Sequence, residues 1–236
     1  NKYGFKISHI DRMSPDQMRD KILSLNNNEA QQERVMNDLL ARMVDLDTDE
    51  FERIIDNYIL ARGIERTITQ LIFPFLERIG VLWQTDHINP AQEHLVTNII
   101  RNKIIVGIET TVSHTKIDKT VLLFLPEKEH HELGLLFMYY LLKSRGIRVI
   151  YLGANVPVKD AAFILNHKKP GIAYVHLTST ASNFNFEKFL GDISSKFEKG
   201  TLVISGHITQ SYKKKLPANI EFKRSLSEVM EFISTL

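Results

Sequence analysis

A short charged segment near the middle of the chain combines residue types that can bind a metal. The segment reads Glu129-His130-His131-Glu132-Leu133-Gly134. A carboxylate two residues before His131 can hold one imidazole nitrogen, which leaves the other nitrogen to act as a metal ligand. Gly134 removes a side chain one helical turn later, where a bulky ligand could pass close to the backbone. Taken alone, the segment is better explained as a solvated helix start with two incidental histidines.

A second candidate group lies in the first half of the chain, where nine residues separate Trp83 from Glu93 and His94. Trp83 lies on an apolar stripe, which is typical of a core residue. Glu93 complements the positive end of a helix. A helix start also disfavours imidazolium, so His94 stays neutral and able to hydrogen-bond or ligate. Taken singly, each of these residues has a structural explanation.

The elements that position the second group are helices. From about residue 28 to 113 the pattern is helical, with apolar residues at three- and four-residue steps. Pro74 lies inside one stripe and predicts a kink. Asn89 and Pro90 followed by Gln92 are typical of a capped helix start. Short connections between the helical segments predict antiparallel neighbours and therefore a four-helix bundle.

The pattern changes after Lys119. Short apolar runs occupy residues 120–126, 148–153, 171–177, 201–206 and 220–223, and helical stretches lie near 131–145, 158–168, 184–198 and 225–235. Strands without polar alternation are buried on both faces, and their alternation with helices implies parallel crossovers. We therefore predict a doubly wound, five-stranded parallel sheet of the flavodoxin-like kind. Its ligands should lie at the carboxyl ends of the strands, where the His131 segment follows the first strand.

Glu129-x-His131-x-x-Gly134 resembles the Asp-x-His-x-x-Gly signature of cobalamin-binding domains, with Glu in place of Asp. The resemblance implies that His131 is the lower ligand of cobalt in place of the cofactor's own tail base, with Glu129 as its hydrogen-bond partner. It also implies that the nucleotide tail lies beside Gly134 and the 178–180 loop. His130 is the rival ligand, but it has no carboxylate two residues before it and no glycine three residues after it.

Two further elements of that family have counterparts here. The family has Ser-x-Leu on the third strand and Gly-Gly after the fourth, and the corresponding residues of this chain are Thr178, Ser179, Thr180, Ser205 and Gly206. These differences add bulk near the tail channel, so they bear on affinity more than on location. The resemblance covers the whole second half of the chain.

The spacing of Trp83, Glu93 and His94 resembles the motif of the MerR-type photoreceptor regulators, the CarH/CarA/LitR group. In that group a four-helix bundle covers the upper face of adenosylcobalamin. The resemblance implies that Trp83 packs on the adenosyl group and that Glu93 and His94 contact it. The string GFKISHIDRM, which begins at Gly4, is similar to the last helices of a MerR DNA-binding domain.

These resemblances predict a domain organisation and a function. We expect a remnant of the DNA-binding domain over residues 1–26, the helical cap over 27–117 and the cobalamin-binding domain over 118–236. Because the chain begins with Asn, we expect it to be part of a longer protein. The resemblance implies a homo-oligomer, a tetramer in the dark on operator DNA, which falls apart when light breaks the cobalt–carbon bond. It implies no enzymatic turnover.

One residue departs from the photoreceptor pattern. The family places a histidine directly after the motif tryptophan, where it captures the upper face of cobalt after photolysis, and this chain has Gln84 there. His87 and His94 are nearby, but neither occupies the matched position. We therefore expect the stable two-histidine photoproduct to be lost or altered.

The bulk composition sets limits on other functions. The chain has 236 residues, a net charge of +2 and no cysteine, which excludes disulfides and thiolate chemistry and fits a cytoplasmic protein. Neither charge nor apolar runs favour a membrane surface or span. Two alternatives stay open. Corrinoid-carrying subunits of methyltransferase systems share the architecture but lack the Trp83 motif and the MerR-like string. The second alternative is a related regulator that has lost cobalamin binding.

Overall fold

The computed structural model describes residues 31–236 except residues 86, 179–183 and 198. The chain divides into two compact units between Ile100 and Arg101. Among the described residues, no helix combines the length and the apolar character needed to cross a membrane.

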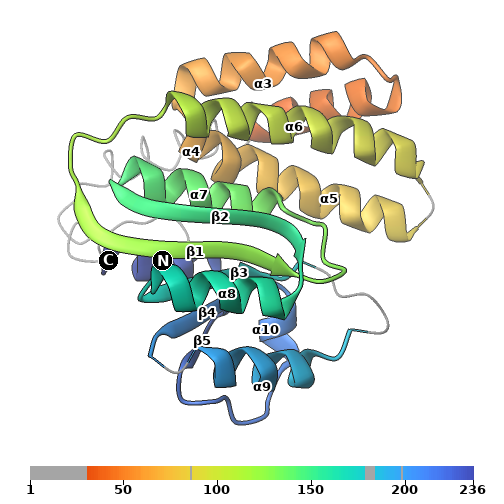
Figure 1. Ribbon diagram of the computed structural model, residues 1–236. Coiled ribbons are helices and arrows are strands. Elements are labelled where there is room, and N and C mark those ends of the chain that lie inside the picture. The colour runs from red at the N-terminus through yellow and green to blue at the C-terminus, as the bar shows by residue number, and fades with distance from the viewer. Residues whose placement is uncertain (1–30, 86, 179–183, 198) are drawn as a thin grey trace, which may run out of the picture. The chain divides into compact units, whose positions relative to one another are not determined.

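The first unit is helical (Figure 1). Its described elements are a helix over residues 31–44, α3 (Thr48–Arg62), α4 (Ile64–Thr67), the π-helical segment η1 (Ile68–Ile72), α5 (Phe73–Gln84) and the start of α6 (Pro90–Thr110). Apolar side chains from these helices are fully buried, among them Leu39, Phe51, Leu71 and Phe75. Since α4, η1 and α5 follow one another without a break, the described helices form the four-helix arrangement that the periodicity predicts.

Pro74 changes the helix type near it. Because Pro74 has no N–H, it cannot bond the carbonyl oxygen of Gln70 as an α-helical residue would. The structure has π-helical geometry over Ile68–Ile72, and the Gln70 carbonyl accepts a hydrogen bond from the Gln32 side chain instead. The irregularity that the proline predicts is therefore present as a π-helical segment.

The start of α6 carries the predicted cap. Asn89 Oδ1 accepts from the backbone N–H of Ala91 at 2.8 Å, and Gln92 Oε1 accepts from the N–H of Asn89 at 2.8 Å. Gln92 also donates to the Val44 carbonyl at 3.0 Å, which ties this helix start to the first helix. These contacts confirm the predicted capped start and fix the helical turn that carries Glu93.

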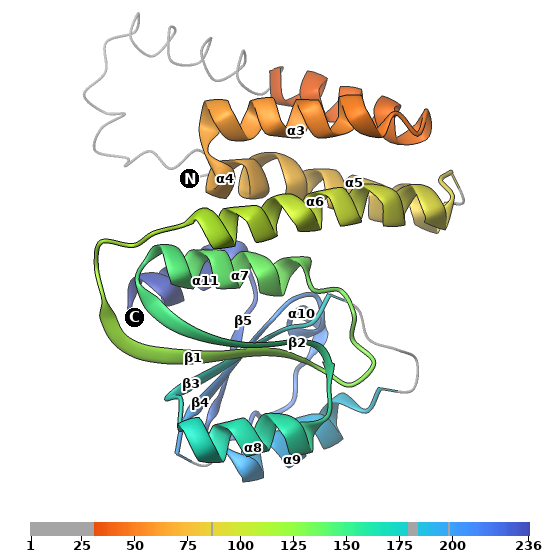
Figure 2. The same ribbon diagram turned by 45° about the horizontal axis from the view of Figure 1, so that its top comes forward.

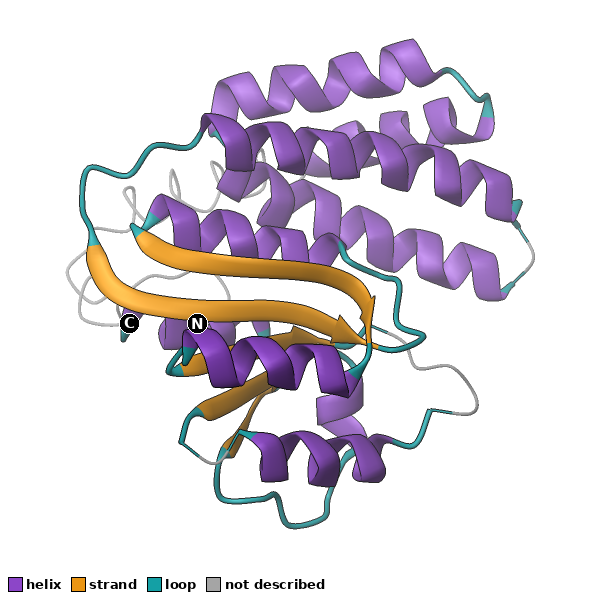
Figure 3. Ribbon diagram, viewed as in Figure 1, coloured by secondary structure: helices purple, strands orange, loops and turns teal. Residues whose placement is uncertain are grey.

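The second unit is a five-stranded parallel sheet with helices on both faces (Figures 2 and 3). The strands are β1 (Ile117–Pro126), β2 (Ile147–Val156), β3 (Ile172–His176), β4 (Thr201–Ser205) and β5 (Ile220–Lys223). The helices are α7 (Leu133–Ser144), α8 (Val158–Lys168), α9 (Phe186–Lys196), the short α10 (Ile208–Ser211) and α11 (Leu226–Ser234). The strand order β2-β1-β3-β4-β5 is the predicted flavodoxin-like order.

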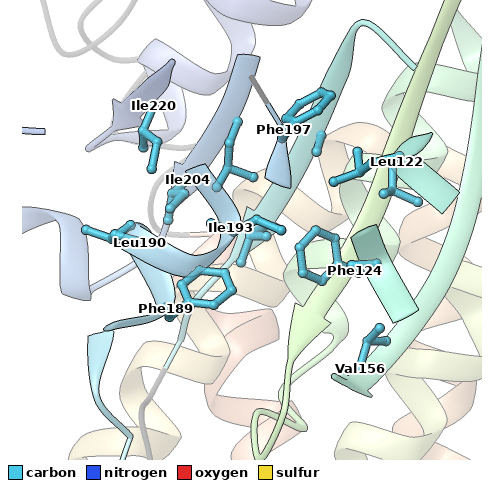
Figure 4. Close-up of a cluster of buried hydrophobic side chains, with 14 of the residues drawn as sticks. Leu122, Phe124, Val156, Phe189, Leu190, Ile193, Phe197, Ile204 and Ile220 are labelled. Carbon is cyan, nitrogen blue, oxygen red and sulfur yellow. The ribbon is translucent and has the colours of Figure 1, made fainter. Parts of the chain in front are cut away.

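The two faces of the sheet have different partners. Helices α8 and α9 cover one face and α7 and α11 the other (Figure 2). Figure 4 shows Phe124 of β1 beside Phe189 and Ile193 of α9, within a cluster of buried apolar side chains on the first face. Because side chains alternate along a strand, the residues between the members of this cluster face α7. His176 and Ser205, which are register partners in β3 and β4, belong to that second set.

Candidate functional site

The His131 segment lies in the loop between β1 and α7, at the carboxyl end of the sheet. Asn155, near the end of β2, holds this loop. Its Oδ1 accepts from the Lys128 backbone N–H at 2.9 Å, and its own N–H donates to the Glu129 carbonyl at 3.0 Å. Lys128 and Asn155 both have positive φ, +71° and +57°. Asn155 was not among the residues predicted from the sequence, although asparagine tolerates this conformation.

The buried carboxylate of Glu129 holds the loop through hydrogen bonds. Its side chain is only 4% exposed, and Oε1 accepts from the backbone N–H groups of His130 and His131 at 2.9 Å each. The same oxygen lies 2.7 Å from Nδ1 of His131. An ionised carboxylate can only accept, so Nδ1 donates this hydrogen bond, and in the neutral imidazole the lone pair is then on Nε2. The hydrogen bond that the spacing predicts between Glu129 and His131 is therefore present.

The donor set at His131 suits a metal that already has most of its ligands. A bare transition ion takes about four or more protein donors, whereas His131 offers one imidazole nitrogen. An ion held in a macrocycle such as a corrin needs only an axial ligand. With 58% of its side chain exposed and its ring oriented by Glu129, His131 fits that role.

The space beside Gly134 fits a corrinoid tail less well. A Cβ added to Gly134 would lie 2.3 Å from Cδ2 and 2.6 Å from Nε2 of His176. Real Cβ atoms do not approach other atoms so closely, so the glycine is required by the imidazole that packs on it. The location that the resemblance gives to the nucleotide tail is thus filled by a side chain of this protein.

His176 belongs to a polar chain beneath α7. Its Nδ1 lies 2.7 Å from Oγ of Ser205, which in turn lies 2.5 Å from the hydroxyl of Tyr174. Desolvation lowers the pKa of His176 to about 4, although the negative charge of Glu129 opposes this shift. Burial raises the pKa of Tyr174. At neutral pH all three groups are uncharged, and a chain of donations from Tyr174 through Ser205 to His176 satisfies them.

Of the other residues predicted to border the nucleotide tail, Ser205 ends β4 and Gly206 follows it. Gly206 has φ of +101°, and an added Cβ would lie 2.1 Å from the carbonyl oxygen of Leu177, so the backbone requires glycine there. Thr178 directly follows Leu177 and is exposed. Ser179 and Thr180 lie outside the described residues.

A cluster around Glu132, which was not predicted from the sequence, fixes the start of α7. Arg101 Nε donates to Oε1 of Glu132 at 2.6 Å, and the Tyr151 hydroxyl donates to Oε2 at 2.8 Å. Tyr151 stacks on Tyr139 of α7, with ring centroids 5.3 Å apart. Burial is the main cause that raises the pKa of Tyr151. The residue next to His131 is therefore held by α6 and by β2.

The second predicted group lies beside the connection between α5 and α6. Trp83 is 56% exposed, so it is not the core residue that its apolar stripe suggests. His94 Nδ1 lies 2.9 Å from Oε2 of Glu93, and the His94 side chain is 73% exposed. In the first unit taken by itself, the three side chains are thus accessible rather than used in helix packing.

Comparison with known proteins gives independent information on both halves. Residues 35–106, which are helical here, match the family described as B12 binding domain. The transcriptional repressor CarH of Myxococcus xanthus is 26% identical over 176 residues, 74% of this chain and 58% of CarH. The repressor CarA of the same organism is 26% identical over 161 residues, 68% of this chain and 54% of CarA. The chain is therefore similar to CarH/CarA-type B12-binding proteins.

The chain spans little more than half the length of either relative. Both relatives are HTH-type repressors rather than enzymes, which agrees with the expectation of no turnover. Among solved structures, the monomethylamine corrinoid protein of Methanosarcina barkeri matches with a TM-score of 0.65 and 11% identity, over 86% of this chain and 99% of that one. At this identity the likeness shows the shared fold alone.

Proposed function

We propose that the chain is the cobalamin-dependent sensory and oligomerisation part of a transcriptional regulator, with adenosylcobalamin as its cofactor and light as its signal. The observation that carries the proposal is the His131 imidazole oriented by buried Glu129 at the carboxyl end of β1. The match to a B12 binding domain and the repressor relatives support it. Operator DNA is contacted by a separate N-terminal domain, of which residues 1–26 are the remnant.

Each predicted residue has a role in this proposal. His131 is the lower ligand of cobalt, and Glu129 positions it. Trp83, Glu93 and His94, in the helical cap over residues 27–117, contact the upper adenosyl group. The tail is bordered within the cobalamin-binding domain, residues 118–236, by Gly134, Thr178, Ser179, Thr180, Ser205 and Gly206. When bound, the cofactor supplies a light-sensitive cobalt–carbon bond.

The continuity of α6 supports a signalling role. This single helix carries Glu93 and His94 in its first turn, and Arg101 about two turns later. Arg101 is hydrogen-bonded to Glu132, the neighbour of His131. The start of α6 and the residue that contacts this loop therefore belong to one continuous helix. We propose that this connection couples the state of the cofactor to the assembly of a homo-oligomer, a tetramer in the dark.

The test of ligation compares two neighbouring histidines. The purified chain is mixed with adenosylcobalamin in the dark, free ligand is removed by gel filtration, and the absorption spectrum is recorded. We expect retained corrinoid in the wild type and in His130→Ala, and its loss in His131→Ala. Far-ultraviolet circular dichroism checks that both variants are folded. No retained corrinoid in the wild type, or equal retention in both variants, contradicts the assignment.

Light sensing is tested on the same preparation. Mass is measured by light scattering before and after exposure to green light, and we expect a smaller assembly after exposure. An unchanged mass with retained corrinoid contradicts the photoreceptor part and leaves cobalamin binding in place. Because Gln84 replaces the expected histidine, we also expect the illuminated protein to lack an ordinary bis-imidazole cobalt spectrum. If that spectrum appears, His87→Ala and His94→Ala locate the second ligand.

A further inference from the structure

We infer that His176 determines which corrinoids the chain accepts, because its imidazole occupies the space beside Gly134 and must move for a nucleotide tail but not for a tail-less corrinoid. The inference rests on the proposed function, since it takes His131 as the cobalt ligand. It concerns a residue of this chain that has no place in the resembled motifs.

The packing of His176 on Gly134 is the first observation. Three ring atoms of His176 lie 2.3 to 2.8 Å from the position that a Cβ on residue 134 would take. The contact joins β3 to the first turn of α7, only three residues after His131. A group that passes beside Gly134 therefore meets the imidazole directly.

The second observation is that His176 can leave only by changing its side-chain conformation. Strand β3 lies inside the sheet between β1 and β4, and His176 is in register with Ser205. Its backbone is therefore held by the pairing of β3 with β4. Rotation of the side chain breaks the hydrogen bond between Ser205 Oγ and Nδ1 of His176. Ser205 is only 2% exposed and keeps its contact with Tyr174, so the movement costs Ser205 one of these two hydrogen bonds.

The expected consequence is a penalty that only tailed corrinoids experience. Giving up one buried hydrogen bond, together with the packing on Gly134, corresponds to about a 10-fold loss in affinity. A corrinoid without the tail reaches His131 with His176 in place and avoids this loss.

The experiment compares adenosylcobalamin with adenosylcobinamide, which lacks the nucleotide tail. Dissociation constants for both are measured in the dark by absorption titration of the wild-type chain and of the His176→Ala and His176→Asn variants. We expect both variants to bind adenosylcobalamin about 10-fold more tightly than the wild type. Binding of adenosylcobinamide should stay within about twofold. His167→Ala, which changes an exposed histidine on α8, serves as the matched control and should change neither value.

The outcomes separate this inference from the proposed function. If both corrinoids bind but their affinity ratio is the same in the wild type and in the His176 variants, His176 does not select and the inference is overturned. If no folded variant binds either corrinoid, the proposed function fails and the inference fails with it. His176→Asn keeps a polar partner for Ser205, so it tests the idea even if His176→Ala is unstable. A shift of the His176 ring resonances on binding adenosylcobalamin, but not adenosylcobinamide, gives support independent of the affinities.

Discussion

Replacing Glu129 by Gln tests whether the negative charge of this carboxylate contributes to the site. Gln has the same shape and keeps an oxygen that can accept from the two backbone N–H groups and from Nδ1 of His131. What it removes is the negative charge, which strengthens these hydrogen bonds and raises the basicity of the imidazole. The substitution therefore separates the charge of the carboxylate from its place in the loop.

The magnitude follows from these contacts. Loss of a carboxylate behind a metal-bound histidine typically lowers metal affinity by about 10- to 100-fold, which is about 1.4–2.7 kcal/mol. Glu129 is 4% exposed, so little water competes for its oxygens and we expect the upper half of that range. Stability of the empty chain should fall by a smaller amount, about 1–2 kcal/mol, because three charge-assisted bonds become neutral ones.

The assay is titration with adenosylcobalamin in the dark, together with urea denaturation of the empty chain. Glu127→Gln is the matched control, because Glu127 is exposed in the same loop. Glu129→Ala should bind no better than Glu129→Gln and should be less stable, since two backbone N–H groups lose their acceptor. If folded Glu129→Gln binds within twofold of the wild type, the carboxylate does not tune His131 and the reasoning is refuted.

Three further predictions concern stability. The pKa of His176 is about 4 in the folded chain against 6.5 for the ordinary group, so the unfolded chain binds more protons at mildly acidic pH and stability falls as pH is lowered. Between pH 7.5 and 5 this group should lower the free energy of unfolding by up to about 2 kcal/mol. Urea denaturation of His176→Asn should not show this pH-dependent loss. An equal loss in that variant would contradict the assignment. Asn89→Ala should lower the free energy of unfolding by about 1 kcal/mol in the same assay, because the α6 cap is lost. Asn102→Ala, at an exposed position of that helix, should leave it unchanged. Equal effects of the two substitutions would argue against capping. Gly206→Ala should lower the melting temperature and reduce the free energy of unfolding by about 3 kcal/mol or more. Gly191→Ala, where an added Cβ meets nothing, should be neutral or stabilising. A Gly206→Ala variant as stable as the wild type would refute the close approach.

The strands and their parallel arrangement were predictable because each strand has a local apolar pattern in the sequence. Apolar runs bounded by turn residues gave the strands to within a few residues at either end, and the alternation with helices gave the parallel order. β1 begins at Ile117 and β2 ends at Val156, both beyond the apolar runs, because Ile117 still pairs with Ile147 and Val156 with Pro126. The short helix α10 was not predicted. It is four residues long and has no repeat of an apolar pattern to reveal it.

At the site, contacts between residues close in the sequence were predictable, and contacts between distant residues were not. The bond between Glu129 and His131 spans two residues, so the spacing alone predicted it. Arg101 and Glu132 are 31 residues apart, and their pairing depends on how the second part of α6 lies against the start of α7. The exposure of Trp83, which its apolar stripe taken alone does not predict, has a related reason. An apolar stripe shows which residues share a helix face, but not where that face leaves the core near the end of the helix.

Gly134 shows how a motif residue can be matched correctly and still be explained in two ways. In the signature that the sequence resembles, this glycine makes room for part of the cofactor. In the structure the room is taken by His176, which is 42 positions away along the chain and comes from a different strand. A variant pair distinguishes the two explanations. If glycine serves the imidazole, Gly134→Ala should destabilise the empty wild-type chain and have much less effect when His176→Ala is also present. If it serves only the cofactor, the empty chain should tolerate Gly134→Ala in either background, and the loss should appear only in the affinity for adenosylcobalamin.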